Sequence, residues 1–360
     1  MLKRVKRASL GIFKAGGVFR AVEASGWRGR RLVVLAYLGV SLEDEHEWDP
    51  ASYLSPRHFE ERLAILKRTR CTVLPLHEAV ERLYRGDLPP RSLALTFDGG
   101  NYDFFSRVWP MLESYGYPAT VFLTTYYCDF NRPIFDVACS YLLWKASTRR
   151  SEIPGEPLGL TQNLDLRTER SRSCAKDLLI AVSREWRLDG EDKDHLLERL
   201  ADAGEADYGS LRRKRKLHLL APEEVGRLAA AGIDFQLHTH RHRAPLDRAL
   251  FLKEIQDNRE RIRTLAGTDP DFFSYPDGSI RPEFLPWLPE AGVRFAVTCR
   301  PGAVTVDSHH LLLPRFADSG NLSPVEFESI VTGFASWMPH GRNRSGVPCA
   351  LSRLHASHGL

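Results

Sequence analysis

The side chains best suited to chemistry occur at three places, each directly after an apolar run. Asp98 lies in TFDGG (96–100), three histidines alternate in HTHRH (238–242), and YPDG forms a Pro–Gly turn at 275–278. A carboxylate can serve as a general base, and His238 and His242 have a spacing that lets two rings converge on one metal ion where the chain turns. A lone Asp before glycines is also a common cap or turn residue. The histidine cluster is therefore the strongest single indication of a metal site.

Alternating strand and helix patterns are predicted to position these residues. Seven apolar runs read as β-strands, at residues 31–40, 71–76, 92–97, 119–125, 233–239, 271–276 and 294–299. Amphipathic helices are predicted between and after them, at 57–69, 77–85, 103–115, 222–231, 247–266, 281–291 and 323–336. This alternation predicts a parallel sheet covered by helices, open or closed into a barrel, with ligands bound at the carboxyl ends of the strands. All three chemical motifs fall at such ends.

The predicted domain organisation has three parts. Residues 1–30 form a basic amino-terminal arm, 31–338 form the strand–helix body, and 339–360 read as a flexible tail. Within the body, residues 130–216 contain no convincing strand and are predicted to be a helical insertion, which ends in a basic run at 212–216. The insertion either caps the active face and helps to select the substrate or has no functional role.

Composition excludes several classes of protein. The chain has 360 residues, 43% hydrophobic and 27% charged, which is typical of a globular protein with a large core. Its six cysteines include no CxxC pair, which excludes a zinc finger or a disulfide scaffold and suits a reducing compartment. No apolar run approaches the roughly 18 residues of a membrane span.

The arm carries most of the positive charge. Residues 1–31 contain nine Lys or Arg and one Glu, whereas the whole chain has a net charge of only +4. Lys14 and two glycines interrupt its apolar residues, which argues against a cleaved secretory signal. The arm is predicted either to lie on an anionic membrane surface or to be a solvated leader, and no basic stripe indicates nucleic acid. The expected location is cytoplasmic, with possible peripheral attachment at the inner membrane face.

The three motifs, in this order, resemble those of the NodB-homology polysaccharide deacetylases, carbohydrate esterase family four. That family carries TFDDG, H(S/T)xxH and RxPxG or YPxG at matching places, and the resemblance covers roughly residues 31–130 and 217–320. The resemblance implies an α/β fold, a distorted (β/α)7 barrel, which here would carry the helical insertion. It also implies metal-dependent hydrolysis of acyl groups, usually N-acetyl groups of amino sugars.

The resemblance assigns roles residue by residue. Asp98 matches the catalytic base, His238 and His242 match the two histidine ligands of a divalent metal such as zinc, and Thr239 matches the Ser or Thr that supports the histidine loop. The substrate groove is matched by Tyr275, Pro276 and Gly278.

The chain departs from the family at the metal site. Gly99 stands where the family has its second Asp, a metal ligand, so matching supplies two protein ligands rather than three. His240 is a candidate third ligand if the loop departs from the family's path, and Asp103 is another, although helix capping suits Asp103 better. Weak metal binding, or its loss, is therefore an open alternative.

Two further family features are altered. The family's late general-acid histidine has no clean match, and His309 and His310 lie in the expected region without its motif. Near the start, Tyr37 is followed by Leu38 where the family has histidine.

The sequence thus predicts a hydrolase that removes an N-acetyl or related acyl group from an amino sugar of a cell-surface polysaccharide or its lipid-linked precursor. Asp98 would be the general base and a divalent cation would assist. The alternative is a catalytically silent member of the same fold that binds glycan. Gly99 favours the silent form, whereas Asp98 and both histidines favour the enzyme.

Overall fold

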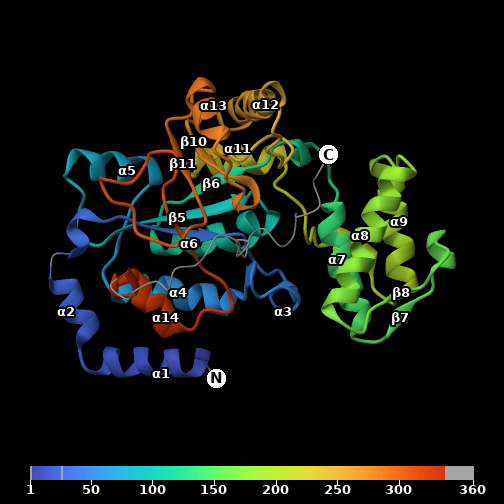
Figure 1. Cartoon of the computed structure of the whole chain (residues 1–360), viewed down its shortest axis with the longest axis horizontal. Coiled ribbons are helices and arrows are strands. Elements are labelled where there is room, and N and C mark those ends of the chain that lie inside the picture. Colours follow the sequence, from blue (N-terminus) through green and yellow to red (C-terminus); the bar gives the residue numbers. More distant parts are fainter. Residues whose placement is uncertain (1, 26, 337–360) are drawn as a thin grey trace.

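Seven strands form the main path of the eight-stranded central sheet in the computed structural model, which describes residues 2–25 and 27–336 (Figure 1). The strand order is β11-β10-β9-β6-β5-β1-β12, and every neighbouring pair is parallel. The strands are β1 (Val33–Tyr37), β5 (Ser92–Gly99), β6 (Thr120–Leu123), β9 (Asp234–Leu237), β10 (Phe272–Ser274), β11 (Phe295–Val297) and β12 (Phe316–Ala317). β4 (Thr72–Val73) pairs with the start of β5, and β2 (Gly39–Val40) pairs with β3 (Tyr53–Leu54).

The sheet curls into an open half-barrel, which confirms the predicted distorted (β/α)7 architecture. β11 and β12 are the two ends of the strand path, and a bridge between Val297 and Leu313 brings the segment before β12 beside β11. Sequence reasoning placed strands at the other main-sheet positions but missed β12. A two-residue strand leaves too short an apolar run to stand out from the surrounding loops.

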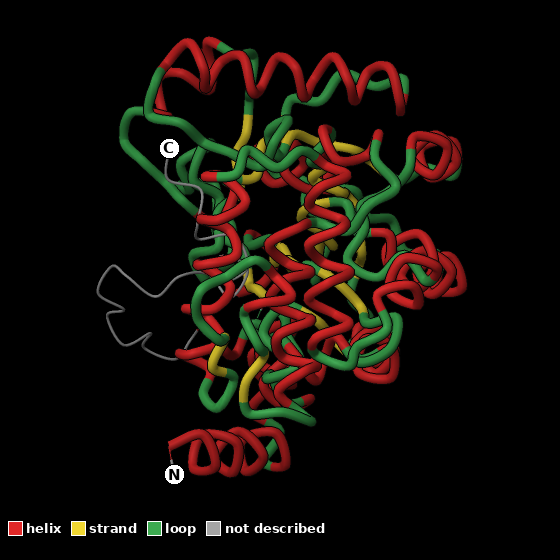
Figure 2. Tube along the Cα trace, turned by 90° about the vertical axis from the view of Figure 1, so that its right-hand side faces the viewer, coloured by secondary structure: helices red, strands yellow, loops and turns green. Residues whose placement is uncertain are grey.

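Helices cover the outside of the half-barrel (Figure 2). They are α4 (Pro56–Arg68), α5 (Leu76–Arg85), α6 (Trp109–Tyr115), α11 (Pro222–Ala230), α12 (Arg248–Ala266), α13 (Phe284–Glu290) and α14 (Pro324–Val331), with the short α3 (Glu45–Trp48) near β3. A π-helical turn, η2 (Phe104–Val108), leads into α6. The strands are buried on both faces, as β5 shows with seven consecutive buried residues, because helices cover one face and barrel side chains the other.

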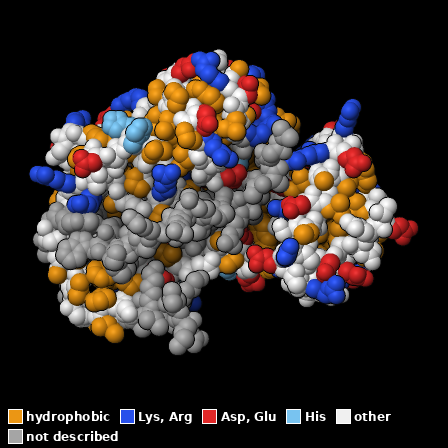
Figure 3. Space-filling view, viewed as in Figure 1, with side chains coloured by type: hydrophobic (Ala, Val, Ile, Leu, Met, Phe, Trp, Pro, Cys, Tyr) orange, Lys and Arg blue, Asp and Glu red, His pale blue; other side chains and the backbone are white. Residues whose placement is uncertain are grey.

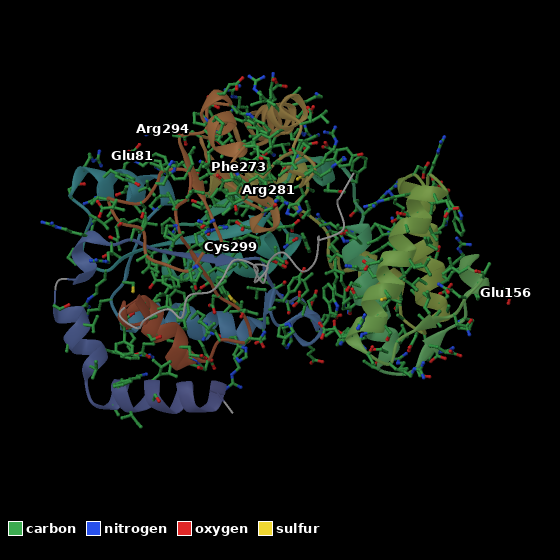
Figure 4. All side chains as sticks on the ribbon, in the orientation of Figure 1. Glu81, Glu156, Phe273, Arg281, Arg294 and Cys299 are labelled. Atoms are coloured by element: carbon green, nitrogen blue, oxygen red, sulfur yellow. The ribbon has the colours of Figure 1, made fainter. Side chains whose placement is uncertain are left out.

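The predicted insertion is mainly helical and stands beside the barrel (Figure 1). It contains α7 (Phe135–Ser147), α8 (Glu169–Glu185), α9 (Gly190–Ala203) and α10 (Tyr208–Arg213), together with an unpredicted antiparallel pair, β7 (Glu152–Ile153) and β8 (Leu164–Asp165). Its apolar side chains form a cluster separate from the main core of the barrel, from Val137 to Leu217. Glu156, labelled in Figure 4, marks the end of the insertion furthest from the barrel.

The basic run at 212–216 fastens the insertion to the barrel. Lys216 is buried, and its Nζ lies 2.9 Å from Glu43 Oε2 and 3.1 Å from Asp44 Oδ1 and donates to the Tyr141 hydroxyl at 2.8 Å. Arg215 pairs with Glu224 and lies over the Tyr102 ring at 4.0 Å. Several basic side chains of this run therefore form ion pairs within the chain.

The amino-terminal arm is helical and lies against the barrel. α1 (Leu2–Ala15) packs on α14 and on α2 (Val18–Ala24), and Leu10 of α1 and Phe19 and Val22 of α2 are buried with Phe334, just after α14. Lys14 pairs with Glu328 at 2.6 Å. This docking corrects the expectation of a free leader.

No helix in the described part of the chain is long and apolar enough to span a bilayer. The predicted tail, 339–360, lies outside the described residues.

Candidate functional site

Asp98 lies at the carboxyl end of β5 and is held by a buried arginine. Its two carboxylate oxygens accept hydrogen bonds from Arg315 Nη1 and Nη2, each at 2.8 Å, and Ser274 Oγ donates to it at 3.3 Å. Asp98 is 4% exposed and Arg315 is 0% exposed. Burial opposes ionisation of the Asp98 carboxyl, but the adjacent Arg315 guanidinium outweighs it, so the pKa of Asp98 is lowered. The carboxylate is ionised at neutral pH.

Arg315 also closes the open side of the half-barrel. Its guanidinium donates to Thr96 Oγ1 and to Ser274 Oγ, both at 3.0 Å, and its Nε donates to the Thr298 carbonyl at 3.0 Å. These partners come from β5, from β10 and from the residue after β11, whereas Arg315 itself precedes β12. Cys299, labelled in Figure 4, marks this place, since its Sγ is 3.9 Å from Arg315 Nη2.

Sequence reasoning missed Arg315 and Ser274. The available signal was a single arginine within the otherwise apolar stretch 311–316, LLLPRF, since a charge in a buried run needs a partner. Ser274 lies inside a predicted strand, and nothing in the sequence distinguishes it from an ordinary strand serine.

The turn after Asp98 depends on two glycines. Gly99 and Gly100 have φ values of 96° and 80°, a region that side chains disfavour. A Cβ on Gly100 would lie 2.3 Å from Leu123 Cδ1, whereas one on Gly99 would meet nothing closer than 3.9 Å. An Asp at 99 would thus have room but would strain the backbone by about 1–2 kcal/mol.

The histidine motif begins immediately after β9 and folds back on itself. Thr239 and His242 both adopt left-handed backbone conformations, with φ of 61° and 56°. Thr239 is fully buried, and its Oγ1 accepts a hydrogen bond from the Arg243 N–H at 3.0 Å, which closes the loop. The rings of His238 and His242 consequently lie 4.9 Å apart between centroids. The motif is turned rather than extended, so its three histidines do not share one direction.

The hydrogen bonds of His238 fix its ring. His238 Nδ1 lies 2.9 Å from the Ser274 carbonyl oxygen, which can only accept, so the proton is on Nδ1 and the lone pair is on Nε2. The backbone N–H of His238 donates to Asn258 Oδ1 at 3.0 Å. A metal-binding histidine characteristically donates its second ring nitrogen to such a carbonyl.

Asn258 is a third residue that the sequence analysis missed. It lies on α12 with no exposed surface, and its Nδ2 donates to the Leu123 carbonyl and to Thr125 Oγ1, both at 2.9 Å. It therefore joins the helix to β6 and to the histidine loop. Its position was readable, because Phe251, Ile255, Asn258 and Ile262 repeat at core spacing along the helix.

Neither candidate third ligand joins the histidine pair. His240 Nδ1 lies 2.8 Å from Thr125 Oγ1, and its ring meets the edge of Tyr126. Asp103 is buried, and its pKa is raised well above the usual value by burial and by nearby Glu45. Its side chain makes no capping bond to the following helix, so the expected capping role is wrong.

The turn motif at 275–278 is more buried than expected. Tyr275 is 1% exposed and its hydroxyl donates to the Leu311 carbonyl at 2.9 Å, which places its ring in the core rather than on a groove wall. Pro276 is buried as well, and Gly278 is half-buried with a φ of 64°. Because it is buried, the Tyr275 side chain is not available to contact a substrate, which corrects the predicted role.

His309 and His310 are not part of this site. The His310 ring lies 4.5 Å from Tyr84 of α5 and 5.2 Å from Phe295, and both histidines line a separate depression with Leu285 and Pro289. Neither is placed to act as the general acid beside Asp98.

A pocket opens beside His242 between the barrel and the insertion. Its cavity volume is only about 30 Å³, which is room for one or two water molecules and far below the few hundred Å³ of a site that encloses a whole ligand. Polar lining comes from Asn101, Thr124, Tyr127 and His242, and Gly99 forms part of its wall. The other lining residues are apolar: Leu38, Ile134, Val137, Leu217 and Leu219, with Tyr53. Leu38, the residue that replaces a family histidine, thus faces this pocket.

The two histidines fit as nitrogen ligands of a divalent cation, but they are one ligand short of the usual catalytic set. Across residues 2–25 and 27–336, no group of three or more His, Cys, Asp or Glu side chains is arranged to hold a metal ion. The position of the missing carboxylate is Gly99, on the pocket wall.

Comparison with known proteins identifies a family and a shared fold. A sequence model described as polysaccharide deacetylase matches residues 85–150 and 192–296. The fold is similar to a Streptococcus pyogenes deacetylase, PplD, solved with acetate (TM-score 0.55, 16% identity, covering 84% of this chain and 98% of that one).

Two further structures share the fold. IcaB from Ammonifex degensii gives a TM-score of 0.53 at 15% identity over 84% of this chain and 97% of its own. BC0361, a polysaccharide deacetylase from Bacillus cereus, gives a TM-score of 0.51 at 14% identity, covering 84% of this chain and 69% of its own. No curated protein sequence matches this chain significantly.

The buried ion pair makes a direct prediction about stability. Arg315→Met leaves the Asp98 carboxylate buried without its charge partner. Asp98→Asn likewise leaves the Arg315 guanidinium buried without a carboxylate partner. Each should lower the free energy of unfolding by about 3–5 kcal/mol. The double variant should be destabilised by clearly less than the sum, as measured by urea denaturation.

The pair should also respond to pH. Because the pKa of Asp98 is depressed in the folded state, its contribution is full above the ordinary aspartate value near 4 and is lost as pH falls through the lower folded value. If each single variant lowers the free energy of unfolding only slightly, and the two losses add in the double variant, the pair does not hold the site together.

Proposed function

Since this chain belongs to the polysaccharide deacetylase family, we propose that it hydrolyses an N-acetyl or related acyl group on an amino sugar of a cell-surface polysaccharide or its lipid-linked precursor. The observation that carries the proposal is a buried, ionised Asp98 that interacts electrostatically with His238, whose ring is paired with that of His242 on the pocket wall. A general base and two nitrogen ligands for a cation are parts that metal-assisted amide hydrolysis requires.

In this proposal, His238 and His242 hold a divalent cation, with zinc the expected ion. When bound there, the cation supplies Lewis-acid polarisation of the acyl carbonyl and lowers the pKa of the attacking water. The Ser274 carbonyl and Asn258 orient His238, and the Thr239 hydroxyl holds the loop that presents His242. With two protein ligands, affinity for the cation should be weak.

Asp98 accepts the proton of the attacking water. Arg315 keeps this carboxyl ionised despite its burial, and Ser274 and Arg315 together fix the orientation of its oxygens. General-base catalysis of this kind contributes about 10²–10⁴-fold to the rate. The apolar lining from Leu38, Val137 and Leu217 would exclude bulk water from the acyl group.

A second function deserves the same test. Gly99 at the family's ligand position favours a chain that binds glycan in this pocket without turnover. The two functions predict the same binding and differ in whether acetate is released.

Removing either histidine should weaken cation binding and turnover together. We expect His238→Ala and His242→Ala each to raise the Kd for Zn²⁺ at least tenfold in calorimetry. Acetate release from N-acetylated hexasaccharides should fall at least 100-fold, because one of only two ligands is lost. His195→Ala, which changes an exposed histidine of α9, is the matched control. Equal zinc affinity in the wild type and all three variants would contradict the assignment of His238 and His242 as metal ligands. Binding of the hexasaccharide by the wild type without acetate release would favour the silent function.

We also propose that residues 1–30 attach the chain to an anionic membrane surface on the cytoplasmic side. The arm combines nine basic residues within 1–31 with exposed apolar side chains: Ile12 is 72% and Phe13 41% exposed on α1. Basic residues contribute about 1 kcal/mol each near an anionic surface, and exposed apolar residues add burial in the headgroup region.

Ile12→Ser should reduce sedimentation with phosphatidylserine-containing vesicles several-fold, and binding of the wild type should decrease with added salt. Val306→Ser is a matched control, since Val306 is 50% exposed at a place remote from the arm in sequence. If the wild type does not sediment with these vesicles at low salt, the membrane proposal is contradicted and the arm only docks against α14.

A further inference from the structure

A second groove, larger than the pocket at His242, runs between the histidine loop and the insertion. Its cavity volume is about 560 Å³. One wall is formed by η3 (Tyr126–Asp129), the segment after it and Arg243 of the histidine loop, and the other by α8 and the first turns of α9. Tyr127 and Ile134 line both this groove and the small pocket, so the two cavities are adjacent. Figure 3 shows Lys and Arg side chains on both sides of the junction between barrel and insertion.

The charge of this groove is not balanced. Five basic residues line it (Arg132, Arg184, Lys193, Arg241 and Arg243) against three aspartates (Asp136, Asp189 and Asp194). The aspartates are already engaged or buried. Asp189 accepts from the backbone N–H groups that begin α9, Asp194 accepts from the Tyr208 hydroxyl and pairs with Arg132 at 3.4 Å, and Asp136 is 5% exposed.

Two of the cations remain available to a ligand. Arg243 is exposed and Lys193 half-buried, and neither forms an ion pair with any carboxylate of the described chain. Lys193 instead lies over the Phe135 ring, with Nζ 5.8 Å from its centroid. The two side chains approach the groove from opposite walls, one from the barrel and one from the insertion. Two cations that line one groove without a carboxylate partner favour the binding of an anionic group there.

Aromatic rings flank the same groove. Tyr126 is 37% and Phe130 43% exposed, with their ring centroids 5.3 Å apart. Arg241 lies over the Tyr126 ring at 5.2 Å while pairing with Glu254 at 3.1 Å, which holds this ring in place. Exposed aromatic side chains next to a pocket are typical of ligand-binding surfaces, and the C–H face of a sugar ring can pack on them.

The groove lies next to the proposed reaction site. Arg243 follows His242 in the chain, and Arg243 lies close enough to Tyr127 to oppose the rise of its pKa, which burial brings to about 12. A glycan whose acyl group reaches His242 would therefore bring its next units to Arg243, Lys193 and the exposed rings.

We propose that this groove binds an anionic unit of the glycan, carrying a carboxylate or a phosphate, next to the sugar whose acyl group reaches His242. The inference rests on the proposed function for the site at His242 and adds that the natural glycan is acidic. It also gives the insertion a role, since α9 supplies one of the two cations.

The test measures binding rather than turnover. The Kd of the full-length protein is determined by calorimetry at 50 mM NaCl, in EDTA to suppress cation-dependent turnover. The three probes are a hyaluronan hexasaccharide, which carries uronates, UDP-N-acetylglucosamine, which carries a diphosphate, and neutral chitohexaose. The variants are Arg243→Gln/Lys193→Gln and the control Arg57→Gln/Arg167→Gln, whose side chains are 87% and 72% exposed elsewhere.

The groove variant should bind its preferred anionic probe about tenfold more weakly and chitohexaose within twofold of wild type, whereas the control should change neither. Preference for the hexasaccharide over UDP-N-acetylglucosamine assigns a carboxylate, and the reverse assigns a phosphate. The proposal is overturned if the wild type binds neither anionic probe more tightly than chitohexaose, or if both variants lose the same affinity. A chain that passes this test but releases no acetate keeps the anionic groove and loses the proposed function.

Discussion

The buried pair of Asp98 and Arg315 is the interaction on which the site depends. A guanidinium with no exposed surface is tolerated only with a charge partner and satisfied donors, and here its donors reach Asp98, Thr96, Ser274 and the Thr298 carbonyl. These contacts gather strands from both ends of the half-barrel around one carboxylate. The same interaction therefore closes the fold and sets the ionisation of the proposed base.

The histidine loop is arranged by neighbours of that pair. The backbone carbonyl of Ser274, whose hydroxyl contacts Asp98, fixes the His238 ring, and Asn258 ties the loop to α12 and β6. The chain returning from the insertion supports the other side, because the Leu220 N–H donates to the Gly100 carbonyl at 2.9 Å and the Tyr102 N–H to the His218 carbonyl at 2.9 Å. The insertion is thus connected by backbone hydrogen bonds to the turn that follows Asp98, and its helices form a wall of both cavities.

The sequence predicted the architecture well because strand and helix periodicities are local properties. It also located the carboxyl-end motifs that contain Asp98, His238 and His242. It did not predict Arg315, Ser274 or Asn258, since their roles arise from contacts between residues far apart in the chain. Tyr275 was misjudged for a related reason: a motif gives the residue type and position but not the direction of the side chain, and this ring points into the core.

The most direct test of the account is the isotopic composition of released acetate. An N-acetylated hexasaccharide is incubated with the protein and Zn²⁺ in H₂¹⁸O, and the acetate is analysed by mass spectrometry. The account predicts acetate that carries one ¹⁸O from the attacking water, at a rate that depends on both His238 and His242. If no labelled acetate forms above the level seen with the histidine variants, while the glycan still binds, the claim that this centre is hydrolytic is contradicted.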